Sequence, residues 1–310
     1  MAQEQCRYKT SIGGQALIEG IMMKGPEKSA MAVRTPSGEI DLEVWDNPGG
    51  KLKKVKKIPF VRGIFNLVDS LVTGYRCLMK SAEKAGMEEE PSPFEKKMNE
   101  KFGKAFTVVF NGVILCLSVA IALGLFMFLP ALFVKLIGGG ISSSLARTAL
   151  EGVIKILIFL LYLFLVTRMK DIRRVFEYHG GEHKSIACYE AMEELTVENV
   201  RKHTRFHPRC GTSFMLLVLI ISILVTSVVT WDSLLIRVLL KVALLPVVVG
   251  ISYELIKYAG RHDNLATKII SAPGLWLQRL TAFEPDDSQM EVAITALKAV
   301  IPAEAGADKW

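Results

Sequence analysis

Two histidines and a glutamate lie close together in the stretch His179-Gly180-Gly181-Glu182-His183. On a continuous helix, His179 and His183 would lie on one face with Glu182 beside them, because residues four positions apart are neighbours there. Inverted zinc proteases use this H-x-x-E-H order, in which both histidines bind zinc and the glutamate is the general base. The spacing therefore indicates a metal-dependent hydrolytic site.

The glycine pair inside this stretch favours a different interpretation. Each glycine in a helix interior costs about 1 kcal/mol relative to alanine. We therefore expect a helix that begins near Gly181 and leaves His179 at or before its cap. Glu182 would then lie in the first turn, where the helix dipole favours a carboxylate without any catalytic role. General base and helix-start residue both stay open for Glu182.

More metal-binding side chains follow in His207-Pro208-Arg209-Cys210-Gly211, which has the layout of a zinc knuckle with histidine in the first ligand position. A single loop histidine is usually solvated, but four of the chain's five histidines lie in this one segment. Imidazole and thiolate together suit Zn²⁺, usually with four ligands. The predicted cofactor is therefore zinc, and Glu182 is the candidate catalytic residue. The candidate ligands are His179, His183, His203, His207 and Cys210.

The segments that must position these residues are largely apolar. The chain has 310 residues, of which 51% are hydrophobic and only 22% are charged. About 20 apolar residues cross the hydrocarbon core of a bilayer. Four apolar stretches are candidate spans, namely 105–132, 152–167, 212–230 and 234–256, and the first is longer than this requirement. The predicted fold class is mainly α, a polytopic membrane protein with about four transmembrane helices and a small N-terminal β-rich cytoplasmic domain.

The fourth stretch is the least regular of the set. Arg237 and Lys241 fall in its first third, and Pro246 interrupts it. We expect both cations to reach the near interface, as Lys155 does by snorkelling at one end of the second stretch. A re-entrant segment is the alternative for 234–256.

Lysine and arginine predict the orientation. The segment between the second and third stretches is rich in both residues, whereas only Lys135 and Arg147 lie between the first and second. Basic runs also occur at 51–57 and 96–104. By the positive-inside rule these parts are cytoplasmic. The prediction is a multi-pass protein of the bacterial cell membrane with both termini in the cytoplasm.

Composition argues against several other classes of protein. The N-terminal residues lack the apolar core of a secretory signal peptide. Five scattered cysteines do not form an extracellular disulfide framework. The net charge of +7 is expected from basic cytoplasmic flanks, so we expect no direct nucleic-acid binding. Neither a P-loop nor a dinucleotide fingerprint is present.

The predicted domains follow from these patterns. Strands at Ala30–Thr35 and Glu39–Val44 flank a turn at 36–38, and an amphipathic helix from Pro59 to about Lys84 has an apolar face suited to the bilayer surface. Near the C-terminus we expect a helix at Asn264–Leu280, broken at Pro273-Gly274, and a last helix opened by a capping box at Ser288–Glu291.

The domains are 1–58, β-rich; 59–104, amphipathic helix and linker; 105–167, two transmembrane helices; 168–211, a cytoplasmic His/Cys loop; 212–256, two more transmembrane helices; and 257–310, cytoplasmic C-terminal helices.

Five blocks of the sequence resemble the YqhQ-like family of bacterial membrane proteins. They are residues 13–26, 59–63, 178–184, 207–214 and 284–287. The resemblance implies a polytopic membrane protein of unknown function, of a kind described at times as a metal-dependent enzyme. It also draws attention to Glu19, which we expect to pack against the histidine segment or Arg62. The alternatives for Glu19 are a buried ion pair or an exposed strand position.

Two functions from different classes follow. The first is a non-catalytic membrane-associated factor, in which zinc staples the N-terminal β-domain to the helices and the partner is another membrane or ribosome-associated protein. The second is a metal-dependent hydrolase with Glu182 as general base. The number of protein ligands separates them, because four close a structural site and three leave a position open for catalysis.

Overall fold

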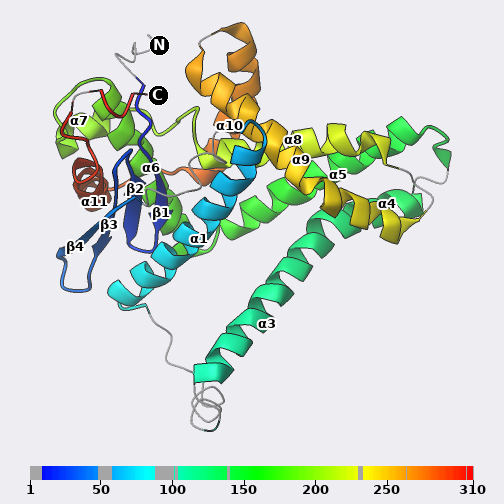
Figure 1. Cartoon of the computed structure of the whole chain (residues 1–310), viewed down its shortest axis with the longest axis horizontal. Coiled ribbons are helices and arrows are strands. Elements are labelled where there is room, and N and C mark those ends of the chain that lie inside the picture. The colour runs from blue at the N-terminus through cyan, green and yellow to red at the C-terminus, as the bar shows by residue number, and fades with distance from the viewer. Residues whose placement is uncertain are drawn as a thin grey trace. The chain divides into compact units, whose positions relative to one another are not determined.

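The computed structural model describes residues 9–47, 58–87, 101, 104–137, 140–229, 233–262, 264–304 and 306–309, without the side chains of 104–108 and 111. It is mostly helical and contains a four-stranded antiparallel sheet near the N-terminus (Figure 1). The chain forms two compact units. The first comprises Met1–Met87, Leu163–Ile221 and Pro246–Trp310, and the second comprises Glu88–Tyr162 and Ser222–Leu245. The lysines at 51–57 and 96–97, and most of the expected linker, lie outside the described residues.

The sheet has the strand order β1-β2-β3-β4. Its strands are β1 Gly13–Leu17, β2 Gly20–Lys24, β3 Lys28–Arg34 and β4 Ile40–Asp46. The predicted hairpin at 30–44 is confirmed, since β3 and β4 pair with Arg34 opposite Ile40. Gly38 closes this turn at φ 87, a conformation that glycine adopts without strain.

Helices cover both faces of the sheet. Side chains of a strand alternate between faces, so Ile21 and Met23 pack with helices α6 (Lys170–Glu190) and α11 (Asp287–Lys298) on one side. Met22 and Leu17 pack on the other side with α1 (Val61–Lys84). The three helices surround the sheet in Figure 1. Strand β1 is an edge strand of this layered core.

Helix α1 confirms the predicted amphipathic helix. Its side chains Leu71, Tyr75 and Met79 are 62%, 59% and 54% exposed. The other described residues therefore leave much of its apolar face exposed. Gly63 and Gly74 lie on its buried side.

Within the segment 168–211, α6 begins earlier than expected and is one continuous helix through Gly180 and Gly181. A Cβ atom at Gly180 would lie 1.8 Å from the carbonyl oxygen of Phe283, and one at Gly181 would lie 3.6 Å from Pro285. The glycines therefore let α6 approach the segment that precedes α11, and this packing offsets their low helix propensity. The expectation that the helix begins near Gly181 is wrong for this reason.

Two details near the C-terminus also differ from expectation. Helix α10 runs unbroken over Leu265–Thr281 and includes Pro273, because the helix is held by buried contacts such as that of Gly274 with Ser213. Helix α11 is capped by Asp286 with Gln289, not by Ser288.

Four helices in the described part of the chain are long and apolar enough to cross a membrane. They span Gly112–Ile137, Ser144–Val166, Gly211–Val228 and Leu234–Arg261. The first is built of α3 (Lys104–Leu123), a π-helical turn (Gly124–Phe128) and α4 (Leu129–Ile137). The others correspond to α5 (Ser144–Val166), α8 (Gly211–Val225) with a 3₁₀ turn, and α9 (Leu234–Arg261). Helix α9 stays continuous through Pro246.

The second unit contains a buried ion-pair network between α5 and α9. Arg237 and Lys241 are 1% and 2% exposed and both pair with Glu151. Both cations were expected at the near interface; within the unit they pair with the Glu151 carboxylate, which neutralises part of their charge. Lys155, expected to snorkel, is 5% exposed. The sequence prediction missed Glu151 because the predicted span began one residue after it.

The two ends of the described chain are joined in the first unit. Thr10 and Lys309 form an antiparallel β-bridge. The amide of Ser11 donates to the carbonyl oxygen of Asp308 at 2.5 Å, and the hydroxyl of Thr10 hydrogen-bonds to the Asp308 carboxylate.

Candidate metal centre

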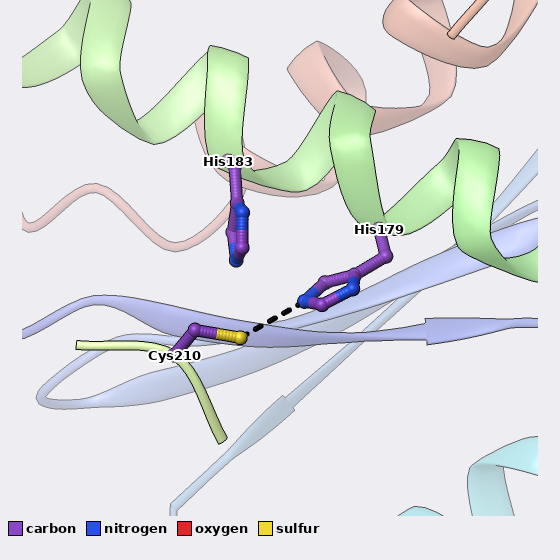
Figure 2. Close-up of side chains that lie close together, drawn as sticks. All are labelled: His179, His183 and Cys210. Atoms are coloured by element: carbon purple, nitrogen blue, oxygen red, sulfur yellow. Dashed lines mark hydrogen bonds between the residues drawn. The ribbon is translucent and has the colours of Figure 1, made fainter. Parts of the chain in front are cut away.

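Three side chains with metal-binding atoms converge in the first unit. His179 and His183 project from successive turns of α6, and Cys210 immediately precedes α8 (Figure 2). Their ligand atoms all lie within 4.8 Å of one another, and all three residues are buried. The H-x-x-E-H spacing thus places both histidines on one helical face, as a continuous helix requires.

Backbone carbonyls fix the orientation of both imidazole rings. The Nδ1 atom of His179 lies 2.6 Å from the carbonyl oxygen of Thr281, and that of His183 lies 2.6 Å from the carbonyl oxygen of Arg205. A carbonyl oxygen only accepts hydrogen bonds, so each Nδ1 carries the proton. Both Nε2 atoms are therefore the ones available to a metal. Metal-binding histidines in proteins are commonly held in this way.

The two Nε2 atoms differ in their surroundings. That of His179 lies 3.0 Å from the sulfur of Cys210. That of His183 is buried and has no hydrogen-bond partner among the described residues. An unsatisfied buried nitrogen is costly, and a bound cation would satisfy it.

The electrostatics of the cluster favour a thiolate. Burial disfavours the charged ring of His179, but the neighbouring Cys210 outweighs burial and raises the pKa of His179 to about 9. Burial likewise disfavours the Cys210 thiolate, yet the charges of His179 and His183 hold the pKa of Cys210 well below its usual range. The thiolate is the form of cysteine that binds metals.

Glu182 lies on the same helix and faces the same space. Its carboxylate accepts a hydrogen bond of 3.0 Å from the backbone amide of Gly14 in β1. Burial raises the pKa of Glu182, against the lowering effect of His179 and His183. Glu182 and the three metal-binding side chains line one cavity of about 980 Å³.

The other two candidate ligands are not part of the group of three. His207 lines the same cavity, and its ring centroid lies 5.5 Å from that of His183. The Nε2 atom of His207 lies 3.8 Å from the Glu190 carboxylate and 3.2 Å from Arg209. His203 belongs to a separate group with Cys188 and Glu193, whose ligand atoms also lie within 4.8 Å of one another. Of the five predicted ligands, three thus come together, His207 lies beside them on the same cavity wall, and His203 lies in a separate group.

Glu19 pairs with α6 instead of Arg62. Its carboxylate accepts hydrogen bonds from the guanidinium group of Arg174, and from the hydroxyl of Tyr178 at 3.1 Å. Arg62 pairs with Glu254. Of the two expected contacts, Glu19 therefore makes the one with the segment that carries the histidines and not the one with Arg62. It does so through an ion pair, which is only partly buried.

The donors fit zinc. Two imidazoles and a thiolate are ligands that Zn²⁺ prefers, and three protein ligands leave one tetrahedral position open. The carbonyls of Thr281 and Arg205, and the amide of Gly14, were not predicted. Backbone groups give no signal in sequence, so only the fold identifies them.

Comparisons with known proteins agree with the sequence resemblance. The model of a family described as a protein of unknown function (DUF1385) matches residues 58–303. The chain is 38% identical over 300 residues to the uncharacterized protein YqhQ of Bacillus subtilis (strain 168), covering 94% of this chain and 93% of the relative. No solved structure matches the chain. This chain is therefore a member of the DUF1385 family of uncharacterised proteins, and YqhQ is one of its relatives.

Proposed function

We propose that the chain is an integral membrane protein whose first unit is a zinc-dependent hydrolase. The observation that carries this proposal is the convergence of His179, His183 and Cys210 with an unpartnered Nε2 atom, beside Glu182 and on the wall of a cavity. Three protein ligands next to a carboxylate favour catalysis over a closed structural site.

Each residue has a defined task in this proposal. His179, His183 and Cys210 would hold zinc, with the Nδ1 hydrogen bonds fixing both rings. A zinc ion there supplies Lewis acidity and makes water nucleophilic at neutral pH. Glu182 accepts the proton of the attacking water and delivers it to the leaving group. The Gly14 amide holds the Glu182 carboxylate in place.

We further propose that the four apolar helices cross the bacterial cell membrane, with both termini and the candidate metal centre in the cytoplasm. The apolar face of α1 would then rest on the bilayer surface. The basic residues between the second and third apolar helices support this orientation. Reporter fusions after Gly140 and after Glu194 should report opposite sides of the membrane. Reports from the same side would contradict the topology.

The decisive experiment measures zinc and function together in the full-length protein. We expect about one zinc per chain, lost in His183→Ala. Glu182→Gln preserves size and a hydrogen-bond acceptor but removes the basic oxygen. It should keep zinc and reduce activity by about 10²–10⁴-fold, as judged by complementation of a deletion strain. Glu198→Gln, the same change at a residue whose side chain is 82% exposed, is the control and should complement fully. Folded protein that binds no zinc would refute the proposal.

The non-catalytic factor is the second candidate. It is supported by the bond between the Glu182 carboxylate and the Gly14 amide, which links α6 to the sheet and is a structural contact in its own right. Its partner would be another membrane or ribosome-associated protein. Full complementation by Glu182→Gln, with failure of His183→Ala, would favour this candidate.

A further inference from the structure

The outer edge of β1 carries backbone groups that the sheet does not use. Hydrogen bonding alternates along an antiparallel pair, and Leu17 and Gly20 close the two-residue hairpin between β1 and β2. Leu17, Gln15 and Gly13 therefore direct their amides toward β2. The amides of Gly14, Ala16 and Ile18 point to the outer edge.

Two of these three outward amides have side-chain partners. Gly14 donates to Glu182 of α6, and Ile18 donates to the hydroxyl of Ser81 of α1 at 3.2 Å. The amide of Ala16, between them, makes no hydrogen bond to any described residue outside the ladder. Gly14 is exposed and Ala16 is half-buried, so this edge is accessible.

The cavity that holds the candidate metal centre runs along this same edge. Its walls come from β1, α1 and α6, and they include Gly14 and Ala16 together with Glu182 and the three metal-binding side chains.

We propose that the substrate is a peptide segment in extended conformation, which binds by adding a strand to the outer edge of β1. This inference rests on the proposed hydrolase function. An extended peptide offers an acceptor for the outward amide of Ala16 and donors for the outward carbonyl oxygens of Gly14 and Ala16, while the Gly14 amide stays bonded to Glu182. Strand addition at an exposed edge is a recurrent mode of peptide recognition. Because Glu182 is bonded to that same edge, the added strand passes the candidate metal centre.

The reaction at this position is hydrolysis of a peptide bond. Water adds to the carbonyl carbon, the C–N bond breaks, and the products are a carboxylate and an amine. Glu182 takes a proton from the water and gives it to the departing nitrogen, so no other reactant is needed.

Proline substitution tests the edge directly. Ala16→Pro removes only an amide that does not pair with β2, and proline is tolerated where an edge amide faces away from the sheet. Leu42→Pro is the matched control on the opposite edge strand. The Thr35 amide donates to the Glu39 carbonyl, so Thr35 and Glu39 are a hydrogen-bonded pair. Hydrogen-bonded pairs then recur at every second residue of β4, at 41 and 43, and the amide of Leu42 points away from β3.

The probe is fluorescently labelled casein, an unfolded protein, incubated with full-length zinc-loaded protein in detergent micelles. We expect cleavage by the wild type and by Leu42→Pro, and a rate at least about tenfold lower for Ala16→Pro, equivalent to about 1.4 kcal/mol. Zinc content must be the same in all three. Cleavage by Ala16→Pro at the wild-type rate, with zinc intact, would overturn the inference.

A second measurement separates failure of the inference from failure of the proposed function. Blocked decapeptides that cover the casein sequence are tested for binding to Glu182→Gln by fluorescence anisotropy. The tightest is then N-methylated at one amide at a time. Strand addition predicts loss of binding at every second residue. If binding is lost at every second residue but the wild type hydrolyses no substrate, the peptide site is supported and the hydrolase proposal is refuted. If phospholipid vesicles or p-nitrophenyl acetate are hydrolysed and no peptide binds, the hydrolase proposal is supported and the peptide inference is refuted.

Discussion

The two units each bury a polar cluster, and the clusters are built in opposite ways. In the second unit, both carboxylate oxygens of Glu151 accept hydrogen bonds, from Arg237 at 3.0 Å and from Lys241. In the first unit, the histidine rings are pinned through Nδ1, and the Nε2 atom of His183 has no hydrogen-bond partner in the described part of the chain.

Under the proposed function, the cluster of the first unit is arranged for a ligand, whereas the cluster of the second unit holds helices together. Every group in a buried ion pair needs a partner, because an unpaired buried charge costs several kcal/mol. A binding site instead keeps some groups unsatisfied in the free protein and fixes them by contacts on their far side. Burial alone does not distinguish the two cases. The buried nitrogen without a hydrogen-bond partner, Nε2 of His183, does.

The largest expected effect is on zinc binding. His183→Ala removes a ligand atom and should weaken zinc affinity by more than about 100-fold, beyond the usual effect of changing a residue that merely orients a ligand. Competition with a chromogenic chelator measures this affinity. His262→Ala, at an exposed histidine, should leave the affinity unchanged. Equal zinc affinity in both variants would show that His183 is not a zinc ligand, and the first cluster would then not differ from the second in binding a ligand.

The next effect concerns the closed network. Glu151→Gln leaves Arg237 and Lys241 buried with a neutral partner, so the free energy of unfolding should fall by about 3–5 kcal/mol. Chemical denaturation in detergent micelles measures the loss, and zinc affinity should not change. Glu198→Gln breaks an exposed pair with Lys202 and should cost under about 0.5 kcal/mol. A loss for Glu151→Gln as small as that of the control would show that the network is not tightly paired.

A smaller effect tests how α6 is placed under the open cluster. Gly180→Ala puts a methyl group against the Phe283 carbonyl and should destabilise the protein by about 1–3 kcal/mol. Gly181→Ala meets only ordinary contacts and should stabilise the helix by up to about 1 kcal/mol. Thermal unfolding of the two variants gives the comparison. Stabilisation by both substitutions would mean that helix propensity, and not the close approach of Phe283 to Gly180, decides the stability at these positions.

The smallest effect is a pH dependence outside both clusters. Burial opposes ionisation of Asp286, but the Ser288 hydroxyl, the Gln289 amide and Arg174 hold the pKa of its carboxyl below its usual range. Since the folded pKa is depressed, the charge stabilises the protein above about pH 4 and the contribution is lost as pH falls through the folded pKa. Asp286→Asn keeps a good cap and should cost about 0.3–1 kcal/mol at pH 7. Unfolding curves at pH 7 and pH 3 should show the difference between variant and wild type shrinking in acid.

Local patterns predicted the elements whose structure depends on nearby residues. Long uncharged stretches identified the four apolar helices, and the turn at 36–38 identified the hairpin of β3 and β4. The apolar period from Pro59 identified α1.

Contacts between distant residues decided what the sequence could not predict. Helix α6 continues through two glycines because Phe283, far along the chain, lies against Gly180. Likewise, five side chains were candidate ligands by residue type. Only the packing of α6 against the segment before α8 determined that His179 and His183 meet Cys210, with His207 beside them and His203 in another group.

The bridge between Thr10 and Lys309 sets a parity rule for the chain. Two segments that hydrogen-bond to each other must occupy the same aqueous compartment, so a chain joined in this way crosses any membrane an even number of times. The rule follows from one pair of strands and is independent of any count of lysine and arginine. Four or two crossings are compatible with this bridge, and three are not. If one of the four apolar helices entered the membrane without crossing it, a second one would also have to leave it uncrossed.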